Sequence, residues 1–353
     1  MSMKPVKWIT IWAVITFGLL GIIACMVYRI DPFFHYHSPL TERYYYVLDN
    51  QRSQNDGIVR HFDYDALITG TSLVDNFRTS EAEALFGGSF IKVPSDGGSY
   101  KEINDLVARA AEVNPDLHIV IRGLDMAGFW TPKDGMREDL GSYPTYLYDS
   151  DPFNDVKYLF NKDIFPGRIC RMFTAVIAKG TKPGITSFDE YSSWEAENGY
   201  GMQAVCPNGI STERTGEDQP LTEEERKQIE DSIRQNVLAV AEDNPDIEFY
   251  YFYPPYSKIW WNELSRTGRL DKQLEAEKCV TELLLPCKNI HLYSFNTRRD
   301  IICDLENYKD TLHYGPWINS EILECMKNGE NLITEENYGE YIRDEESLLK
   351  EEP

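Results

Sequence analysis

Three residues of the types that carry nucleophilic catalysis stand in two short motifs of this chain. Ser72 closes the mostly apolar run Tyr64–Ser72, which ends in Gly-Thr-Ser, and Asp310 and His313 stand three residues apart near the other end of the sequence. A serine hydroxyl becomes a strong nucleophile when a histidine removes its proton and a carboxylate holds that histidine in the correct tautomer. The two motifs therefore predict a site that makes and breaks acyl–oxygen bonds.

The elements that would position these residues are strands that alternate with helical stretches. Because several of the strands are apolar on both faces, they predict a parallel sheet covered by helices, and such sheets carry their sites at the carboxyl ends of the strands. We expect an α/β fold of the flavodoxin-like three-layer type, with a central parallel sheet of about five strands. The predicted strands are Tyr64–Ser72, Ser89–Pro94, Leu117–Asp125, Ile247–Tyr253 and Ile290–Phe295.

Helical periodicity and capping signals mark the segments between the strands. Ser99–Val113 places its apolar residues on one face, and Thr222 followed by Glu225 is a capping box that begins a helix. The segment Lys258–Leu285 is predicted to be helical with a break near Gly268. These helices would connect parallel strands.

The N-terminus predicts a membrane anchor. Trp8–Tyr28 contains 21 uncharged, largely apolar residues, and Lys4 and Lys7 precede it. This length is enough to cross a bilayer, and the basic residues place the short N-terminus in the cytoplasm and the body outside. No small-x-small cleavage site follows the run, which favours a retained anchor over a secretory peptide. An alternative is a bacterial lipobox ending at Cys25, although the apolar run continues beyond that cysteine.

The expected domain organisation follows from these signals. Residues 1–30 form the anchor, 31–60 an aromatic juxtamembrane stalk, and 61–330 the α/β domain, which has an insertion at about 127–220. The insertion is too long for a simple crossover, so we expect it to cover the carboxyl edge of the sheet. The acidic tail, 331–353, is predicted to be a solvated terminus.

Composition excludes several classes of function. A formal charge of −23 argues against nucleic acid as a partner and against electrostatic docking of the body on anionic lipid. Six cysteines lie outside the anchor and permit disulfides in any pairing, but no CxxC motif or Cys/His cluster suggests zinc. His35 and His37 could bind a metal, yet their aromatic neighbours favour a structural role. We expect no metal and no cofactor. The chain contains no Asn-x-Ser/Thr sequon, which favours a bacterial source.

The motifs resemble those of the SGNH (GDSL-like) hydrolase superfamily from about Tyr64 to Trp317. Ser72 stands where the family has its nucleophile, although the block here is Gly-Thr-Ser instead of Gly-Asp-Ser. The family's second block supplies a glycine whose N–H helps to bind the oxyanion. Gly97 and Gly98 are the candidates for that role, and Gly97 is preferred because a helix is expected to begin near Ser99.

The two remaining blocks differ in how closely they follow the family. The last one, Asp-x-x-His, is intact as Asp310 and His313, whereas Asp125 stands where the third block has an asparagine. A carboxylate cannot donate a hydrogen bond to an oxyanion unless it is protonated, so Asp125 departs from the family's pattern. Arg122, in the same apolar strand, needs a partner if it is buried. We expect Arg122 to pair with Asp125 or Asp96, as a structural ion pair or as a clamp for a substrate carboxylate.

The resemblance extends to membrane-anchored members that act outside the cytoplasm. These include the D-alanyl transfer protein of teichoic acid modification and the alginate O-acetylation proteins, and both imply a membrane-bound O-acyltransferase as a partner. We therefore predict serine-dependent acyl transfer or ester hydrolysis on a cell-envelope polysaccharide or teichoic acid, at a bacterial cell membrane. A carbohydrate esterase would use the same site. The alternative from another class is a non-catalytic binding or assembly partner of the acyltransferase.

Overall fold

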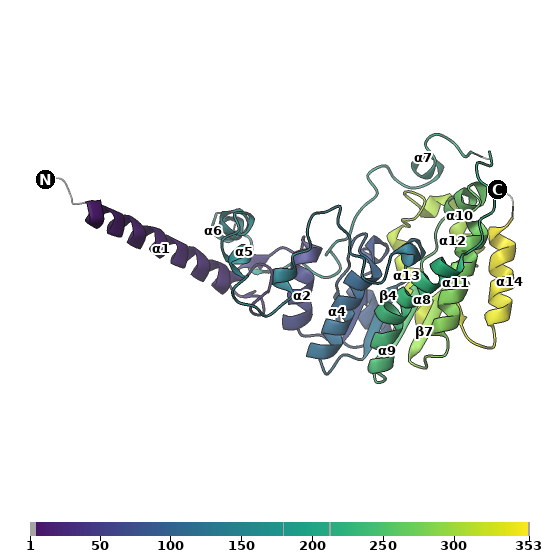
Figure 1. The fold of residues 1–353 in the computed structure, drawn as a ribbon, viewed down its shortest axis with the longest axis horizontal. Helices are drawn as coiled ribbons and strands as arrows, with labels where there is room; N and C mark the ends of the chain where they lie inside the picture. Colours follow the sequence, from purple (N-terminus) through teal and green to yellow (C-terminus); the bar gives the residue numbers. More distant parts are fainter. Residues whose placement is uncertain (1–4, 179, 212, 352–353) are drawn as a thin grey trace. The chain divides into compact units, whose positions relative to one another are not determined.

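The computed structural model describes residues 5–178, 180–211 and 213–351 and folds as two compact units (Figure 1). The first unit combines the chain up to Phe62 with Gly141–Ser187, and the second combines Asp63–Leu140 with the chain from Phe188 onward. This division differs from the predicted one. The stalk predicted at 31–60 and the middle of the insertion predicted at 127–220 fold together, and aromatic contacts such as Phe33 with Tyr158 and Tyr44 with Phe173 join them.

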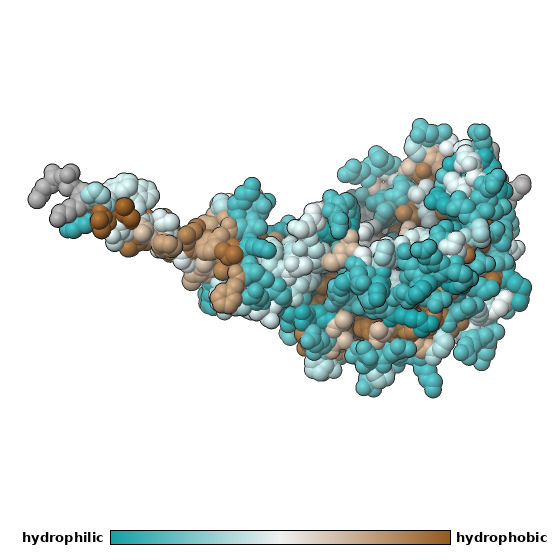
Figure 2. Space-filling view, viewed as in Figure 1, coloured by the Kyte–Doolittle hydropathy of each residue, from teal (hydrophilic) through white to brown (hydrophobic). Residues whose placement is uncertain are grey.

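Unit 1 begins with the predicted N-terminal apolar helix, α1 (Pro5–Ile30), which is long and apolar enough to cross a membrane. Figure 2 shows apolar side chains along its length. The helical stretch between Val156 and Ile177 is interrupted at Phe165, whose extended backbone is the conformation favoured before a proline. The other elements are β1 (Tyr45–Tyr46), α2 (Gln51–His61), η3 (Thr145–Leu147), α5 (Val156–Leu159), η4 (Asp163–Arg168), α6 (Ile169–Ile177) and β5 (Gly184–Ile185), which pairs in parallel with β1.

Unit 2 is built on a mostly parallel sheet that contains all five predicted strands. The order is β3-β2-β4-β6-β7-β8, and only β8 runs antiparallel to its neighbour. The sheet has six strands and not about five, because the two residues of β8 are too few to show any periodicity. The strands are β2 (Ala66–Thr69), β3 (Phe90–Lys92), β4 (Ile119–Gly123), β6 (Glu248–Tyr253), β7 (Ile290–Ser294) and β8 (Leu332–Ile333).

The connections between these strands are helices. Helix α3 packs against α13, while α4 packs against α8 and α9, and α11 packs against α8. The predicted helix at Ser99–Val113 is α4, which begins with a capping box at Ser99. The predicted capping box at Thr222 begins α8, and the predicted break near Gly268 separates α10 from α11. The helices are η1 (Ser72–Val74), α3 (Thr79–Phe86), α4 (Tyr100–Val113), η2 (Met126–Trp130), α7 (Met202–Val205), α8 (Glu223–Ile233), η5 (Arg234–Leu238), α9 (Ala239–Asp243), α10 (Lys258–Arg266), α11 (Leu270–Leu284), α12 (Arg299–Ile302), η6 (Leu305–Asn307), α13 (Pro316–Asn328) and α14 (Tyr338–Leu349).

The acidic tail is not a solvated terminus, which corrects the prediction. It contains β8 and α14, and α14 buries Leu348, Leu349 and the carboxyl group of Glu345. Glu345 lies beside Glu277 of α11, and the two carboxyls share donors from Asn296 and Tyr341. The apolar side chains of α14 are spaced for one helical face, and this face outweighs the acidic composition of the segment.

The buried acid pair makes stability depend on pH. Burial and the neighbouring Glu345 carboxyl raise the pKa of Glu277, and burial also raises the pKa of Glu345. The folded state therefore keeps protons that the unfolded state loses near the usual glutamate pKa of about 4.3. The pair's contribution to stability is complete below that pH and is lost as the pH rises through the folded-state values.

We expect Glu277→Gln to increase the free energy of unfolding at about pH 8, because the wild type must keep a proton on this buried carboxyl that the unfolded chain has released; each unit of pKa shift corresponds to about 1.4 kcal/mol. Near pH 4 the variant should match the wild type, because both then carry a neutral side chain there. Thermal unfolding of the full-length protein in detergent at the two pH values measures this. Asp344→Asn, on the exposed side of α14 and next to Glu345, is the matched control. An unchanged pH dependence in Glu277→Gln would show that the pair is not the titrating group.

Candidate active site

Ser72 stands on a tight turn at the carboxyl end of β2. The turn begins at Gly70, whose φ of +152° is rarely adopted by residues with a side chain, and a Cβ there would lie 2.7 Å from Val74 Cγ1. The Gly70 carbonyl accepts a hydrogen bond from Ser95 N–H at 2.8 Å, which ties this turn to the loop after β3. Only glycine at this position lets the chain turn so closely after the strand and present the Ser72 side chain.

The structure brings the three residues of the predicted triad together. Ser72 Oγ lies 2.8 Å from His313 Nε2, and His313 Nδ1 lies 2.8 Å from Asp310 Oδ2. All three residues are partly exposed, so a substrate can reach the serine. Ser72 and His313 are 241 positions apart in the sequence and are joined by a hydrogen bond of the length needed for proton transfer.

Asp310 organises the loop that carries the histidine. Its Oδ1 atom accepts hydrogen bonds from the backbone N–H groups of Leu312 and His313, at 2.9 and 2.8 Å. Burial acts to raise the pKa of Asp310, but the hydrogen bonds from the His313 ring and these N–H groups outweigh it and lower the pKa below its usual value. The carboxylate therefore stays ionised at neutral pH and holds a proton on Nδ1, which leaves Nε2 free to accept the serine proton.

The histidine loop is held against the serine turn by buried hydrogen bonds. Tyr314 Oη and Asn319 Nδ2 both donate to the carbonyl of Leu73, at 3.1 and 3.0 Å. Tyr308, which pairs with Tyr314 across the loop, donates to the carbonyl of Pro255 at 2.8 Å. All three donor side chains are buried. This network fixes the position of the base, His313, relative to the nucleophile, Ser72.

The Gly97–Gly98 turn distinguishes between the two candidate oxyanion glycines. The N–H of Gly98 donates to the Ser95 carbonyl at 2.8 Å, so it is already used within the turn. Gly97 has φ of +57°, and a Cβ there would collide with the guanidinium group of Arg137. Gly97 therefore stays the preferred candidate, because the N–H of Gly98 is used within the turn.

Asp125 is an acceptor, and it supports the serine turn. Its carboxylate accepts hydrogen bonds from Thr71 Oγ1 at 2.9 Å, from Ala127 N–H at 3.1 Å and from Tyr256 Oη. Burial and the adjacent Asp125 raise the pKa of Tyr256 well above its usual value, so the phenol keeps its proton and donates. Asp125 therefore orients Thr71, the residue before Ser72, and does not supply the oxyanion donor that the family's asparagine provides.

Arg122 does not form the expected ion pair. Its side chain is fully buried, its Nη1 and Nη2 atoms donate to the carbonyls of Asn236 and Tyr100, and its guanidinium lies between the rings of Tyr100 and Tyr251. Burial lowers the pKa of Arg122. Carbonyl oxygens and aromatic faces thus replace Asp125 and Asp96 as its partners, and a substrate carboxylate could not reach it.

A buried carboxyl next to the serine turn, that of Asp75, was not singled out from the sequence. Burial, together with the neighbouring Asp96, raises the pKa of Asp75 to about 9, so this carboxyl is mostly protonated at neutral pH. Lys92 is also buried and donates to the carbonyls of Asp75 and Phe77, and burial lowers its pKa to about 8. The position of Asp75, three residues after Ser72, was the available signal. Protonation keeps a negative charge away from the turn that carries the nucleophile.

The side chain of Trp194 packs against the ring of His313. Its ring lies edge-on to the His313 ring with centroids 5.8 Å apart, and Lys309 Nζ lies 3.3 Å from the Trp194 ring centroid. The backbone N–H of Trp194 donates to Asn76 Oδ1 at 3.0 Å. No local pattern around Trp194 predicts this, because the contact joins a residue of the predicted insertion to residues far away in the sequence.

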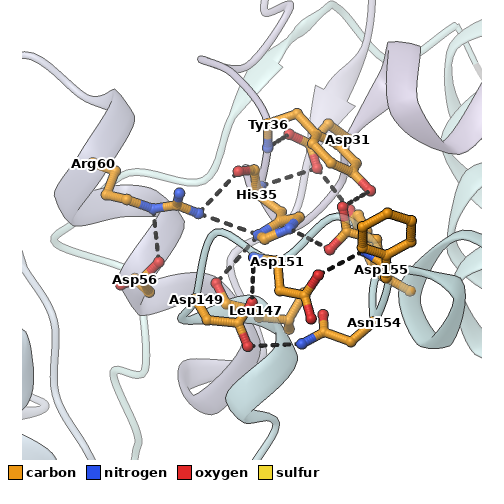
Figure 3. A network of polar contacts seen from close by, with 12 residues as sticks. Asp31, His35, Tyr36, Asp56, Arg60, Leu147, Asp149, Asp151, Asn154 and Asp155 are labelled. Atoms are coloured by element: carbon orange, nitrogen blue, oxygen red, sulfur yellow. Dashed lines mark hydrogen bonds and ion pairs between the residues drawn. The ribbon is translucent and has the colours of Figure 1, made fainter.

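The described ranges contain no group of three or more His, Cys, Asp or Glu side chains that could hold a metal ion. His35 instead takes part in the polar network of Figure 3, where its ring contacts Asp155 and the Leu147 carbonyl. Arg60 donates to the His35 carbonyl and pairs with Asp56. These contacts fit the structural role predicted for His35. All seven cysteines are free, so the disulfides that the sequence permits are not formed.

Comparisons with known proteins add one likeness of fold. No protein-family model and no curated protein matches the chain. A solved structure from Streptococcus pneumonia, described as a candidate platelet activating factor, is similar at 11% identity and a TM-score of 0.38, over 79% of this chain and 90% of that one. At this TM-score the likeness is too loose to support an assignment, so the assignment depends on the geometry of the site.

Proposed function

We propose that this protein is a serine-dependent enzyme that transfers an acyl group to, or removes one from, a cell-envelope polysaccharide or teichoic acid. The observation that carries the proposal is the continuous hydrogen-bonded series from Ser72 Oγ through His313 to Asp310. The order of the five longer strands, β3-β2-β4-β6-β7, supports the flavodoxin-like three-layer arrangement expected for such a site, since it is the order 2-1-3-4-5 along the chain.

The proposed reaction has two halves. In the first, Ser72 Oγ attacks the acyl carbonyl carbon while His313 Nε2 takes the hydroxyl proton, and the backbone N–H groups of Ser72 and Gly97 receive the oxyanion. Collapse of the intermediate expels the donor oxygen, which takes the proton from His313 and leaves an acyl-serine. In the second half, His313 activates a polymer hydroxyl or a water molecule, which attacks the acyl-serine and restores Ser72.

The membrane location is part of the same proposal. Helix α1 would cross a bacterial cell membrane once, with the body outside the cytoplasm, as Lys4 and Lys7 before the span suggest. Val27 and Ile30, at its end, are buried within unit 1, which supports retention of the helix over cleavage. A membrane-bound O-acyltransferase is the proposed acyl source.

Covalent trapping tests the nucleophile directly. A fluorophosphonate reacts with serines activated by a neighbouring base and forms a stable adduct. We expect the full-length protein in detergent to be labelled at one site, within the peptide that contains Ser72. Ser72→Ala should abolish the labelling, whereas Ser80→Ala, at an exposed serine of the same unit, should not change it. Labelling that survives Ser72→Ala would favour the non-catalytic binding protein.

A further inference from the structure

The end of helix α1 is built into the fold of unit 1. Tyr46 Oη donates to the Ile30 carbonyl at 2.6 Å, and His37 Nε2 lies 3.1 Å from the Tyr28 carbonyl. These contacts satisfy carbonyl groups that a helix end leaves without partners. Helix α1 also packs against α5 and η4. The elements around α5 are therefore held close to the point where α1 ends.

The length of α1 places that point at the surface of a bilayer. About 20 residues of helix cross a hydrocarbon core of about 30 Å, so an apolar run that begins at Trp8 leaves the core near Tyr28. The side chains around α5 would then lie at the level of the lipid headgroups. Three of them are large, apolar and exposed: Phe153 is 89% exposed, Val156 53% and Phe160 42%. Single exposed apolar residues are ordinary, but three within eight residues beside a membrane helix form a patch.

The same stretch carries a net positive charge, whereas the chain as a whole is strongly negative. Residues 153–178 contain four basic and two acidic residues, a net charge of +2 in a protein whose total is −23. One of the two acids, Asp155, is buried and bonded to His35 and Tyr36. Helix α6 buries Ile169 and Met172 while exposing Arg171 and Ile177. Basic residues interspersed with exposed apolar ones are typical of segments that lie in a membrane interface.

We propose that residues 153–178, the interfacial segment, bind the anionic surface of the bilayer that α1 spans. Phe153, Val156 and Phe160 enter the headgroup layer, and basic side chains such as Lys157 and Lys162 pair with lipid phosphates. Each basic residue near an anionic surface increases partitioning about fivefold. A lipid surface is favoured over a protein partner because a membrane helix always brings lipid beside its own end. The inference rests on the membrane anchoring included in the proposed function.

Photolabelling from within the bilayer tests this inference on the full-length protein. The protein is reconstituted in vesicles of phosphatidylcholine alone, or of equal parts phosphatidylcholine and phosphatidylglycerol, and exposed to an apolar aryl azide that partitions into lipid. Labelled peptides are quantified by mass spectrometry. We expect label in α1 in both vesicles, and label in residues 153–160 that is at least fivefold higher in the anionic vesicles.

Two triple variants distinguish the effect of charges in the interfacial segment from the effect of the protein's overall charge. Lys157→Glu, Lys162→Glu and Arg171→Glu together should reduce labelling of residues 153–160 at least fivefold in anionic vesicles while α1 stays labelled. The matched control, Lys227→Glu, Arg234→Glu and Lys288→Glu, reverses three exposed charges of unit 2 and should leave the pattern unchanged.

The outcomes distinguish this inference from the proposal on which it rests. Label in α1 without label in residues 153–160 would overturn the lipid contact and leave the anchor and the catalytic proposal standing. Label in residues 153–160 that appears only in native membranes, and not in lipid vesicles, would overturn it in favour of a membrane protein partner. The absence of label from α1 itself would refute the anchor, while fluorophosphonate labelling of Ser72 would still report on the catalytic site.

Discussion

Replacing Ser72 or His313 with alanine should remove nearly all ester hydrolysis by this protein. The serine hydroxyl is a weak nucleophile without the imidazole 2.8 Å away, and the imidazole has nothing to activate without the hydroxyl. In serine hydrolases, loss of either partner lowers kcat by about 10⁴–10⁶-fold. Turnover of p-nitrophenyl acetate by the full-length protein in detergent measures the effect. Asp310→Asn should lower kcat about 10⁴-fold, because the amide no longer favours the His313 tautomer that carries its proton on Nδ1.

Matched variants test whether any loss of activity comes from general destabilisation of the fold. Ser347→Ala and His118→Ala change exposed residues of the same types in unit 2 and should retain full turnover. The double variant of Ser72 and His313 should be no slower than either single variant, because the two residues act as one unit. Equal turnover in the wild type and all variants would contradict the catalytic proposal and favour the binding or assembly protein.

The second large effect is expected on the acyl content of the envelope polymer in cells. An enzyme that takes acyl groups from a membrane donor gains effective concentration from an anchor, whereas a hydrolase that diffuses freely needs none. We expect full-length protein to restore acyl groups to the envelope polymer of cells that lack it, and Ser72→Ala to restore none. A secreted form without residues 1–25 should also fail while still hydrolysing model esters. That form keeps Val27 and Ile30, which are buried in unit 1.

The acyl content of the purified polymer separates transfer from hydrolysis. If the secreted form restores acylation as well as the anchored one, the anchor contributes nothing to the reaction. If the full-length protein lowers the acyl content instead of raising it, the carbohydrate esterase is the better description, with the same residues at work. Ser72→Ala in its full-length form is the control for both results, because it retains the anchor and lacks the nucleophile.

The sequence by itself determined the strands and the three residues of the predicted triad. Buried parallel strands are continuous apolar runs, and the turns that follow them begin with residues such as Gly70, so both are visible in a local window. Asp310 and His313 are close enough along the chain for one loop to organise them, and the structure shows that Asp310 accepts hydrogen bonds from its own loop. Local signals were sufficient wherever the partners are neighbours in sequence.

Only the tertiary structure decided which distant residues become partners. Arg122 contacts carbonyl oxygens and tyrosine rings instead of the expected aspartates. Asp125 accepts hydrogen bonds from Thr71 and Tyr256. Glu345 of the acidic tail shares the Asn296 donor with Glu277, 68 positions earlier in the sequence. In each case burial removes water, and the group must take whichever donor or acceptor the packing brings within reach. That choice depends on contacts between segments far apart in sequence, which no local pattern encodes.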